Sequence, residues 1–207
     1  MSFYRSNILP WLVEKGCGVD VLSAKRQEIV PLASGTVLDL GIGTGLNCQF
    51  LDKTKIDRLI GVDPCANSLV MAAKAAARHQ LPLEAIRCGG EAMPIADASV
   101  DTVLLTYTLC TVPDLDAVLR EIDRVLRPTG RILFLEHVCA PTPRLNRWQG
   151  RLQGVWGRLF GGCQLRRDPQ KAFVAAGYSM DHFLQEKVPG TLPPMAWQQT
   201  GIASKSA

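Results

Sequence analysis

Apolar and polar positions recur with two periods along this chain, and the pattern predicts a regular succession of strands and helices. Short apolar runs predict buried strands over 36–40, 58–62, 83–87, 100–105 and 131–137. The segments between them predict helices over 46–52, 66–79 and 115–126. Because strands and helices alternate, we expect an α/β fold with a doubly wound, mostly parallel sheet and helices on both faces.

The two ends of the chain depart from this alternation. Residues 1–34 predict a helical segment in front of the first strand. The last third predicts four further elements, namely helices over 144–160 and 168–176 and strands over 179–187 and 195–204. The last two strands are joined by a segment that begins at Pro189 and ends at Pro194, and we expect them to form an antiparallel hairpin.

The size of the chain limits how these elements are organised. Its 207 residues suffice for one domain with a sizeable core and are too few for two ordinary ones. Apolar residues make up 47% and charged residues 20%, the balance of a soluble globular protein. We expect one domain over 1–207, in which 1–34 forms a helical lid, 36–137 the alternating core, and 138–207 the remaining helices and the hairpin that closes the sheet.

A glycine-rich turn follows the first strand and is the most informative stretch of the chain. The strand contains Asp39, and Gly41, Gly43 and Gly45 then interrupt the apolar run. Glycine adopts conformations that a Cβ forbids and lets a ligand approach the main chain closely. The spacing is G-x-G-x-G. The dinucleotide fingerprint G-x-G-x-x-G would need a glycine where Leu46 stands, which disfavours an oxidoreductase that uses NAD.

Residues that follow the other strands are expected to face the same crevice, because the carboxyl ends of parallel strands meet at one edge of a sheet. The second strand is followed by Asp63, a carboxylate placed to bind both hydroxyls of a ribose. Gly90–Met93 follow the third strand, Thr106–Leu109 end the fourth, and Glu136 and His137 end the fifth.

Together these features resemble the S-adenosylmethionine site of class I methyltransferases. Cys88–Pro94, Ser99–Asp101 and Leu119–Gly130 add a similarity, over about 36–137, to the methyltransferases that include the ubiquinone and menaquinone biosynthesis enzymes. The resemblance implies a Rossmann-like, seven-stranded sheet, with S-adenosylmethionine as cofactor and S-adenosylhomocysteine as product. Many relatives carry an acid for the adenine amine where this chain has Gly89, so we expect main-chain groups to meet the adenine. The residues expected at the cofactor are Asp39, Gly41, Gly43, Gly45, Asp63, Pro64, Gly90, Glu91, Ala92, Thr106 and Leu109.

A narrower resemblance reaches into the substrate half of the chain. Leu109–Val112, Leu135–Val138 and Phe160–Arg166 are similar to the small thiol S-methyltransferases of the methyltransferase-like group, which implies that the acceptor is the thiol of a small, apolar molecule. A thiol with a pKa of about 8.5 is partly ionised at neutral pH, so the protein must mainly align the reactants. His137 is the candidate general base or thiolate stabiliser, with a structural role as the alternative. Candidates for the acceptor pocket, which could equally be core residues, are Tyr4, Trp11, Trp148, Trp156 and Phe160.

Three alternatives to thiol methylation stay open. The first is O-, N- or C-methylation of another small molecule, such as a quinone or a phenol. The second is a protein that binds the cofactor without catalysis, since methyl transfer requires few particular side chains. The third is methylation of trivalent arsenic held by Cys110, Cys139 and Cys163, although scattered cysteines are more often small buried hydrophobic residues.

Positive charge gathers in the last third of a chain whose net charge is only +4. The arginines there are Arg144, Arg147, Arg151, Arg158, Arg166 and Arg167. They predict a solvated basic helix face, with contact to an anionic substrate or a membrane surface as the alternative. Nucleic-acid binding is not expected, because no basic run is interleaved with aromatic residues.

Cysteine usage and the N-terminus bear on the compartment. Seven cysteines are scattered without a C-x-x-C pair, which predicts mostly buried thiols in a reducing, cytoplasmic compartment and no metal site. Members of the thiol methyltransferase group often carry an apolar N-terminal anchor, whereas residues 1–14 are at most amphipathic here. We therefore expect neither a signal peptide nor a membrane-spanning segment. The sequence makes no prediction of the oligomeric state.

Overall fold

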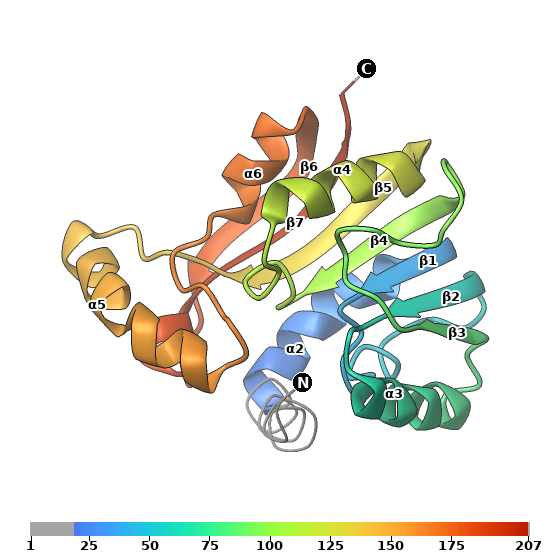
Figure 1. Cartoon of the computed structure of the whole chain (residues 1–207), viewed down its shortest axis with the longest axis horizontal. Helices are drawn as coiled ribbons and strands as arrows, with labels where there is room; N and C mark the ends of the chain where they lie inside the picture. The colour runs from blue at the N-terminus through green and yellow to red at the C-terminus, as the bar shows by residue number, and fades with distance from the viewer. Residues whose placement is uncertain (1–18, 207) are drawn as a thin grey trace.

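A mixed sheet forms the centre of the computed structural model, which describes residues 19–206. Its strands are β1 (Gly35–Leu40), β2 (Ile56–Val62), β3 (Leu83–Ile86), β4 (Val100–Thr106), β5 (Leu126–His137), β6 (Tyr178–Lys187) and β7 (Trp197–Lys205). They lie in the order β3-β2-β1-β4-β5-β7-β6 (Figure 1). β1 to β5 are parallel, and β7 runs antiparallel to both β5 and β6. The predicted fold, a mostly parallel seven-stranded sheet with an antiparallel C-terminal hairpin, is confirmed.

Helices cover both faces of this sheet. They are α2 (Asp20–Ile29), α3 (Ala66–Arg78), α4 (Leu115–Val125), α5 (Pro143–Leu159) and α6 (Pro169–Ala175), with short 3₁₀ turns at Val30–Leu32 and Pro193–Met195. α4 and α6 pack on one face and α2 and α3 on the other, while α5 lies beyond the carboxyl ends of β4 and β5 (Figure 1). No helix within residues 19–206 combines the length and the apolar character needed to cross a membrane.

The hydrophobic core consists of one large cluster on each face of the sheet. Leu38 of β1 packs in the cluster that includes Ile122 of α4 and Phe173 of α6. The neighbouring Val37 points to the opposite face and packs in the cluster that includes Leu22 of α2. Because both faces are covered, the parallel strands are apolar along most of their length, which is why periodicity identified them so well.

The segment after the glycine turn contradicts one prediction. Its apolar pattern predicts a helix over 46–52, but the chain there makes successive turns instead. Cys48 N–H donates to the Gly45 carbonyl at 3.0 Å, and Phe50 N–H to the Asn47 carbonyl at 2.9 Å, so the bonds span three residues rather than four. The helix prediction is wrong because the side chain of Asn47 turns inward to a buried polar network, whose partners fix the backbone in this tighter course.

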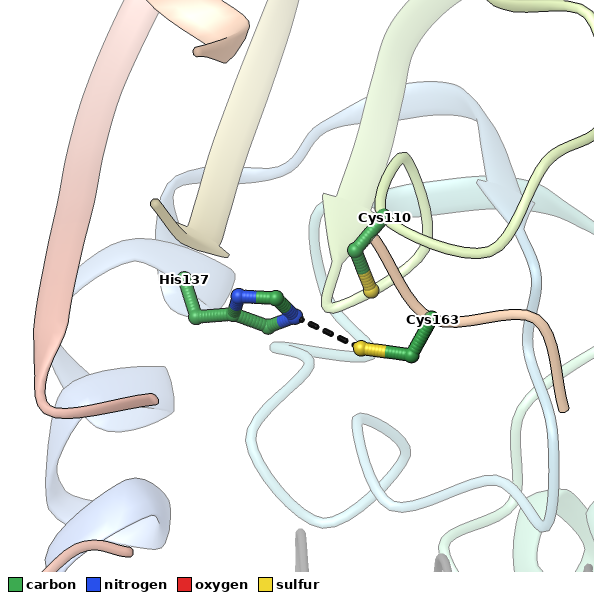
Figure 2. A group of neighbouring side chains, drawn as sticks. All are labelled: Cys110, His137 and Cys163. Carbon is green, nitrogen blue, oxygen red and sulfur yellow. Dashed lines mark hydrogen bonds between the residues drawn. The ribbon is translucent and has the colours of Figure 1, made fainter. Parts of the chain in front are cut away.

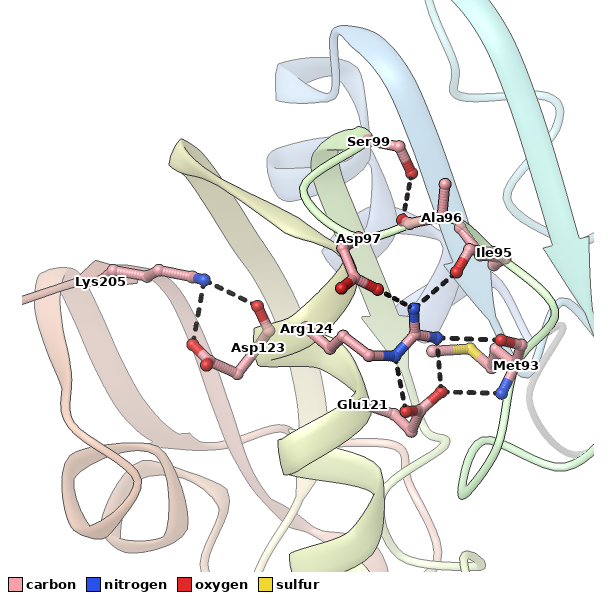
Figure 3. Close-up of polar contacts among 9 residues, drawn as sticks. All are labelled: Met93, Ile95, Ala96, Asp97, Ser99, Glu121, Asp123, Arg124 and Lys205. Carbon is pink, nitrogen blue, oxygen red and sulfur yellow. Dashed lines mark hydrogen bonds and ion pairs between the residues drawn. The ribbon is translucent and has the colours of Figure 1, made fainter.

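An arginine on α4 fastens the loop that follows β3 (Figure 3). The guanidinium of Arg124 donates to the carbonyls of Met93 at 2.9 Å and Ile95 at 2.7 Å. It also pairs with Glu121 at 2.8 Å and Asp97 at 2.6 Å. Glu121 in turn accepts from Met93 N–H at 2.8 Å, and hydrogen bonding to Arg124 lowers the pKa of Glu121 to about 2. These contacts fix the segment just after Gly90, at the edge of the candidate site.

We expect Arg124→Ala to lower the free energy of unfolding by about 1–3 kcal/mol, because two loop carbonyls and two carboxylates lose a charged donor at once. Arg124→Lys should recover little of this loss, since an ammonium group cannot reproduce the planar fork. Urea unfolding measures both effects, with Arg120→Ala on the exposed side of the same helix as control. Equal stability of the Arg120 and Arg124 variants would show that Arg124 does not stabilise the loop after β3.

Candidate functional site

The glycine turn forms the first wall of a cavity beyond the carboxyl end of β1. Gly41 and Gly45 have φ angles of +73° and +85°, which favour glycine over other residues. A Cβ at Gly41 would lie 2.5 Å from Thr108 Oγ1, and a Cβ at Gly45 would lie 2.9 Å from the Cα of Ala72 on α3. The glycines therefore let the turn pass close to its neighbours and leave bare main chain at the cavity wall.

Asp63 stands at the end of β2 and joins the glycine turn to the start of α3. One carboxylate oxygen accepts from Gly43 N–H at 3.2 Å and the other from Cys65 N–H at 2.7 Å. Burial raises the pKa of Asp63, while these two backbone bonds act in the opposite direction. Each oxygen keeps lone-pair capacity for a further donor, so the carboxylate can bind a pair of neighbouring hydroxyls.

The cavity that these residues line has a volume of about 390 Å³. The predicted cofactor residues in its wall are Gly41, Gly43, Asp63, Pro64, Gly90 and Glu91. Glu91 Oε1 is buried and has no hydrogen-bond partner among residues 19–206, so a ligand hydroxyl or amine would satisfy it. The carboxylates of Asp63 and Glu91, together with the exposed main chain of the glycine turn, suit a nucleoside ligand. Tyr107, within the Thr106–Leu109 stretch expected to face the crevice, also lines the cavity. The wall further contains residues that were not predicted, among them Thr44, Ser68, Thr111 and Gly161.

Five predicted cofactor residues lie elsewhere in the structure. Asp39 is fully buried behind the turn, where Asn47 Nδ2 donates to its two oxygens at 3.1 and 3.0 Å and to Thr106 Oγ1 at 3.0 Å. Arg26 of α2 donates to Asn47 Oδ1 at 3.2 Å. Leu109 is a core residue. Gly45 packs closely against Ala72 of α3, and Ala92 is exposed outside the cavity wall.

A second cavity, of about 370 Å³, adjoins the first. The two share Tyr107, Thr111 and Phe160 in their walls, so the spaces are neighbours. Trp156 and Phe160 stack with ring centroids 4.2 Å apart and line the second cavity, as predicted for an acceptor pocket. Leu22 of α2 and the 190–195 segment complete a mainly apolar wall.

Three side chains meet in the wall of this second cavity (Figure 2). They are Cys110 from the loop after β4, His137 from the end of β5, and Cys163 from the loop after α5. His137 Nε2 lies 3.1 Å from Cys163 Sγ, and Trp156 Nε1–H donates to the same sulfur at 3.3 Å. The fold thus places His137 in the wall of the second cavity and brings two cysteines beside it.

Hydrogen bonds and charges within this cluster shift the pKa values of Cys163 and His137. Hydrogen bonding from Cys110, followed by that from His137 and Trp156, outweighs burial and lowers the pKa of Cys163 to about 4. Burial alone would lower the pKa of His137, but its hydrogen bond to Cys163 and the nearby negative charges raise it. The lowered pKa of Cys163 favours its thiolate, and the raised pKa of His137 favours the charged form of the imidazole beside it.

The other aromatic candidates are not brought to this pocket. Trp148 lines an adjoining hollow of about 610 Å³ between α5 and the segment that leads into β7, and this hollow shares Gly190, Thr191 and Pro193 with the second cavity. Tyr4 and Trp11 lie outside the described residues. Most of the arginine-rich segment is exposed on α5, as the solvated-face prediction has it. Arg167 is an exception, because its guanidinium donates to the carbonyls of Leu109 and Val112.

The fold and the nucleoside cavity define a methyltransferase that uses S-adenosylmethionine. A family profile described as "Methyltransferase domain" matches residues 38–134. Geranyl diphosphate C-methyltransferase from Streptomyces coelicolor, solved with S-adenosyl-L-homocysteine, has the same fold, with a TM-score of 0.70 at 15% identity over 89% of this chain and 78% of that one.

Two relatives of similar sequence are named thiol S-methyltransferases. Thiol S-methyltransferase TMT1A of Homo sapiens is 34% identical over 180 residues, which are 86% of this chain and 72% of that protein. Thiol S-methyltransferase TMT1B of Rattus norvegicus is 33% identical over 168 residues, or 80% of this chain and 67% of that protein. The chain therefore belongs to the S-adenosylmethionine-dependent methyltransferase family that contains these proteins.

Proposed function

We propose that this methyltransferase acts on the thiol of a small, apolar acceptor. The observation that carries the proposal is the second cavity, which is mainly apolar, adjoins the cofactor cavity, and holds Cys110, His137 and Cys163 in its wall. The relatives named thiol S-methyltransferases support the same acceptor class. An apolar cavity favours an uncharged organic molecule over a phosphorylated or zwitterionic one, because burying an unpaired charge is costly.

The residues of one cavity would bind the cofactor and those of the other the acceptor. Asp63, Glu91 and the glycine turn would hold the cofactor, whose sulfonium supplies an electrophilic methyl group. Tyr107 and Phe160 line both cavities and would define where donor and acceptor meet. The thiolate, not the thiol, is the nucleophile. We place its formation at His137, which sits in the acceptor wall as the candidate base or thiolate stabiliser.

A panel of small thiols, phenols and amines, assayed for release of S-adenosylhomocysteine, tests the acceptor class. We expect turnover of apolar thiols and little turnover of matched phenols. Phenol or amine turnover without any thiol turnover would reject the proposal, and a protein that binds S-adenosylhomocysteine yet turns over nothing in the panel would favour a binding function.

His137→Ala should lower the turnover of a thiol by about 100-fold or more, the usual contribution of a positioned acid–base group. Its affinity for S-adenosylhomocysteine should stay unchanged, because His137 lines only the acceptor cavity among the two. His182→Ala on the exposed side of β6 is the matched control. Full activity of the His137 variant would show that His137 has a structural rather than a catalytic role.

A further inference from the structure

The cluster in the wall of the second cavity has more ionisable side chains than thiol methylation requires. One basic group would suffice to form a thiolate, yet two cysteines and a histidine meet there. Their ligand atoms all lie within 4.8 Å of one another. Cys110, His137 and Cys163 are buried, with exposed fractions of 3%, 0% and 5%. In Figure 2 the three side chains point toward one another from three separate segments of the chain.

We propose that Cys110, His137 and Cys163 bind a zinc ion, whose fourth coordination position faces the acceptor cavity and takes the sulfur of the acceptor thiol. The metal site stands on the geometry of the cluster alone. The role of the fourth position rests on the proposed function.

The donor set is one that zinc prefers. Zinc binds cysteine sulfur at about 2.3 Å and histidine nitrogen at about 2.0–2.1 Å in a tetrahedron, which puts neighbouring donors roughly 3.5 Å apart. His137 Nε2 and Cys163 Sγ are 3.1 Å apart, and the third donor, Cys110 Sγ, lies within 4.8 Å of both. Side-chain rotations that move the donor atoms by up to about 1 Å would therefore close the site. Catalytic zinc sites keep three protein ligands and one exchangeable position, and two cysteines with one histidine are such a set.

The loops that carry the two cysteines are fastened to each other. Gln164 N–H donates to the Cys110 carbonyl at 2.7 Å, which ties the loop after α5 to the loop after β4. Gln153 of α5 donates to the Cys163 carbonyl at 2.9 Å and accepts from Leu165 N–H at 2.8 Å. The cysteine loops are thus held in register before any ion binds, and such preorganisation favours metal binding.

The histidine strand contributes to the same support. Glu136, buried next to His137, accepts from the N–H groups of Thr108 and Leu109 at 2.7 and 2.9 Å. The carboxylate thereby ties the end of β5 to the start of the loop that carries Cys110. The segments that carry all three ligands are therefore positioned by hydrogen bonds of their main chain and of neighbouring side chains.

Zinc would lower the free-energy cost of forming a thiolate in the acceptor pocket. A thiolate is costly to form in an apolar, partly enclosed space, whereas a thiol that coordinates zinc is deprotonated outright. In the step that we propose, the S–H bond of the acceptor breaks, the sulfur lone pair forms a bond to zinc, and the proton passes to bulk water. No electron is gained or lost. The zinc-bound sulfur keeps further lone pairs and remains a nucleophile.

The proposed zinc site differs from the sequence-based expectation of no metal. That expectation rested on the absence of closely spaced cysteines, and the three ligands come from three distant segments that only the fold brings together.

Metal binding is tested on the full chain, reduced and stripped with a chelator, by titrating Zn²⁺ against a chromophoric competitor. We expect one equivalent to bind, and Cys110→Ser and Cys163→Ser each to lower the affinity by at least about 10–100-fold. Cys139→Ser, which lies outside the cluster, should bind as the unaltered protein does. Binding of S-adenosylhomocysteine verifies that each variant is folded. A folded protein that takes up no Zn²⁺, or cysteine variants that bind it unchanged, would overturn the site.

Cobalt substitution tests the fourth position separately. Co²⁺ bound to the cluster should show thiolate-to-cobalt absorption, which adding an apolar thiol should strengthen and adding the matched phenol should not. An unchanged spectrum would overturn ligation of the acceptor. Equal thiol turnover by the zinc-loaded and stripped proteins would also overturn it and leave the proposed function standing. A spectrum that responds to thiols in a protein that methylates none of them would uphold the metal site and reject the proposed function.

Discussion

Replacing Asp63 by alanine is expected to weaken binding of S-adenosylhomocysteine by about 1–3 kcal/mol, or roughly 5–150-fold. A carboxylate at this strand end can accept from two neighbouring hydroxyls with charge-assisted hydrogen bonds, which are the strong ones. Its loss also removes the acceptor of Gly43 N–H and Cys65 N–H, so the glycine turn and the start of α3 lose their connection.

Isothermal titration of S-adenosylhomocysteine measures this effect. Asp57→Ala is the matched control, because Asp57 lies on the same strand with an exposed side chain. The affinity of Asp63→Asn for S-adenosylhomocysteine should lie between those of the Asp63→Ala and Asp57→Ala variants, since an amide keeps one acceptor oxygen but loses the charge. An Asp63→Ala protein that binds the ligand as tightly as the Asp57 variant would contradict the assignment of the ribose to this carboxylate.

The part of the site that could be predicted is the part encoded locally. The strand, its acid, the alternate glycines and the second strand with Asp63 all lie within one short stretch, and each residue type has a direct stereochemical reason. The carboxyl ends of parallel strands then bring Gly90 and Glu91 to the same cavity by topology alone. The fold and these residues of the candidate cofactor cavity follow from such patterns without knowledge of tertiary contacts.

The acceptor half could not be predicted in the same way. Cys110 and Cys163 are far apart in the chain, and only the packing of α5 beyond the sheet brings their loops together. Trp148 and Trp156 share one helix and similar surroundings in the sequence, yet they line different hollows. Periodicity says which residues share a face of a helix but not which cavity that face meets.

Asp39 shows a third case, in which a residue identified from a motif has a different role. Burial raises the pKa of Asp39 to about 7, against the opposing influence of its hydrogen bonds from Asn47 and of the charge on Arg26. The acid does not face the cofactor cavity but holds Asn47, and through Asn47 the turn that follows the glycines. Its contribution is therefore to the stability of the loop, which makes a prediction about pH possible.

We expect the ionisation of Asp39 to lower the free energy of unfolding as the pH rises from about 4 to about 7. In this range the folded protein keeps a proton on Asp39 that the unfolded chain releases, so the unfolded state is favoured as protons are removed. Glu136, whose pKa burial also raises to about 7, contributes with the same sign. Asp39→Asn removes one of the two groups while keeping an acceptor for Asn47. It should flatten the profile by an amount on the order of 3 kcal/mol across the range.

Urea unfolding at several pH values measures the two profiles, with Asp57→Asn as the control for an exposed carboxylate. The Asp39 variant should be close to the unaltered protein in stability near pH 4 and should gain on it as the pH rises. Parallel profiles would show that the buried carboxylate is already compensated by Asn47 and Arg26, and that its ionisation does not limit stability. If the profiles diverge as expected, the folded protein tolerates an acid that destabilises it near neutral pH because that acid fixes the turn on which cofactor binding depends.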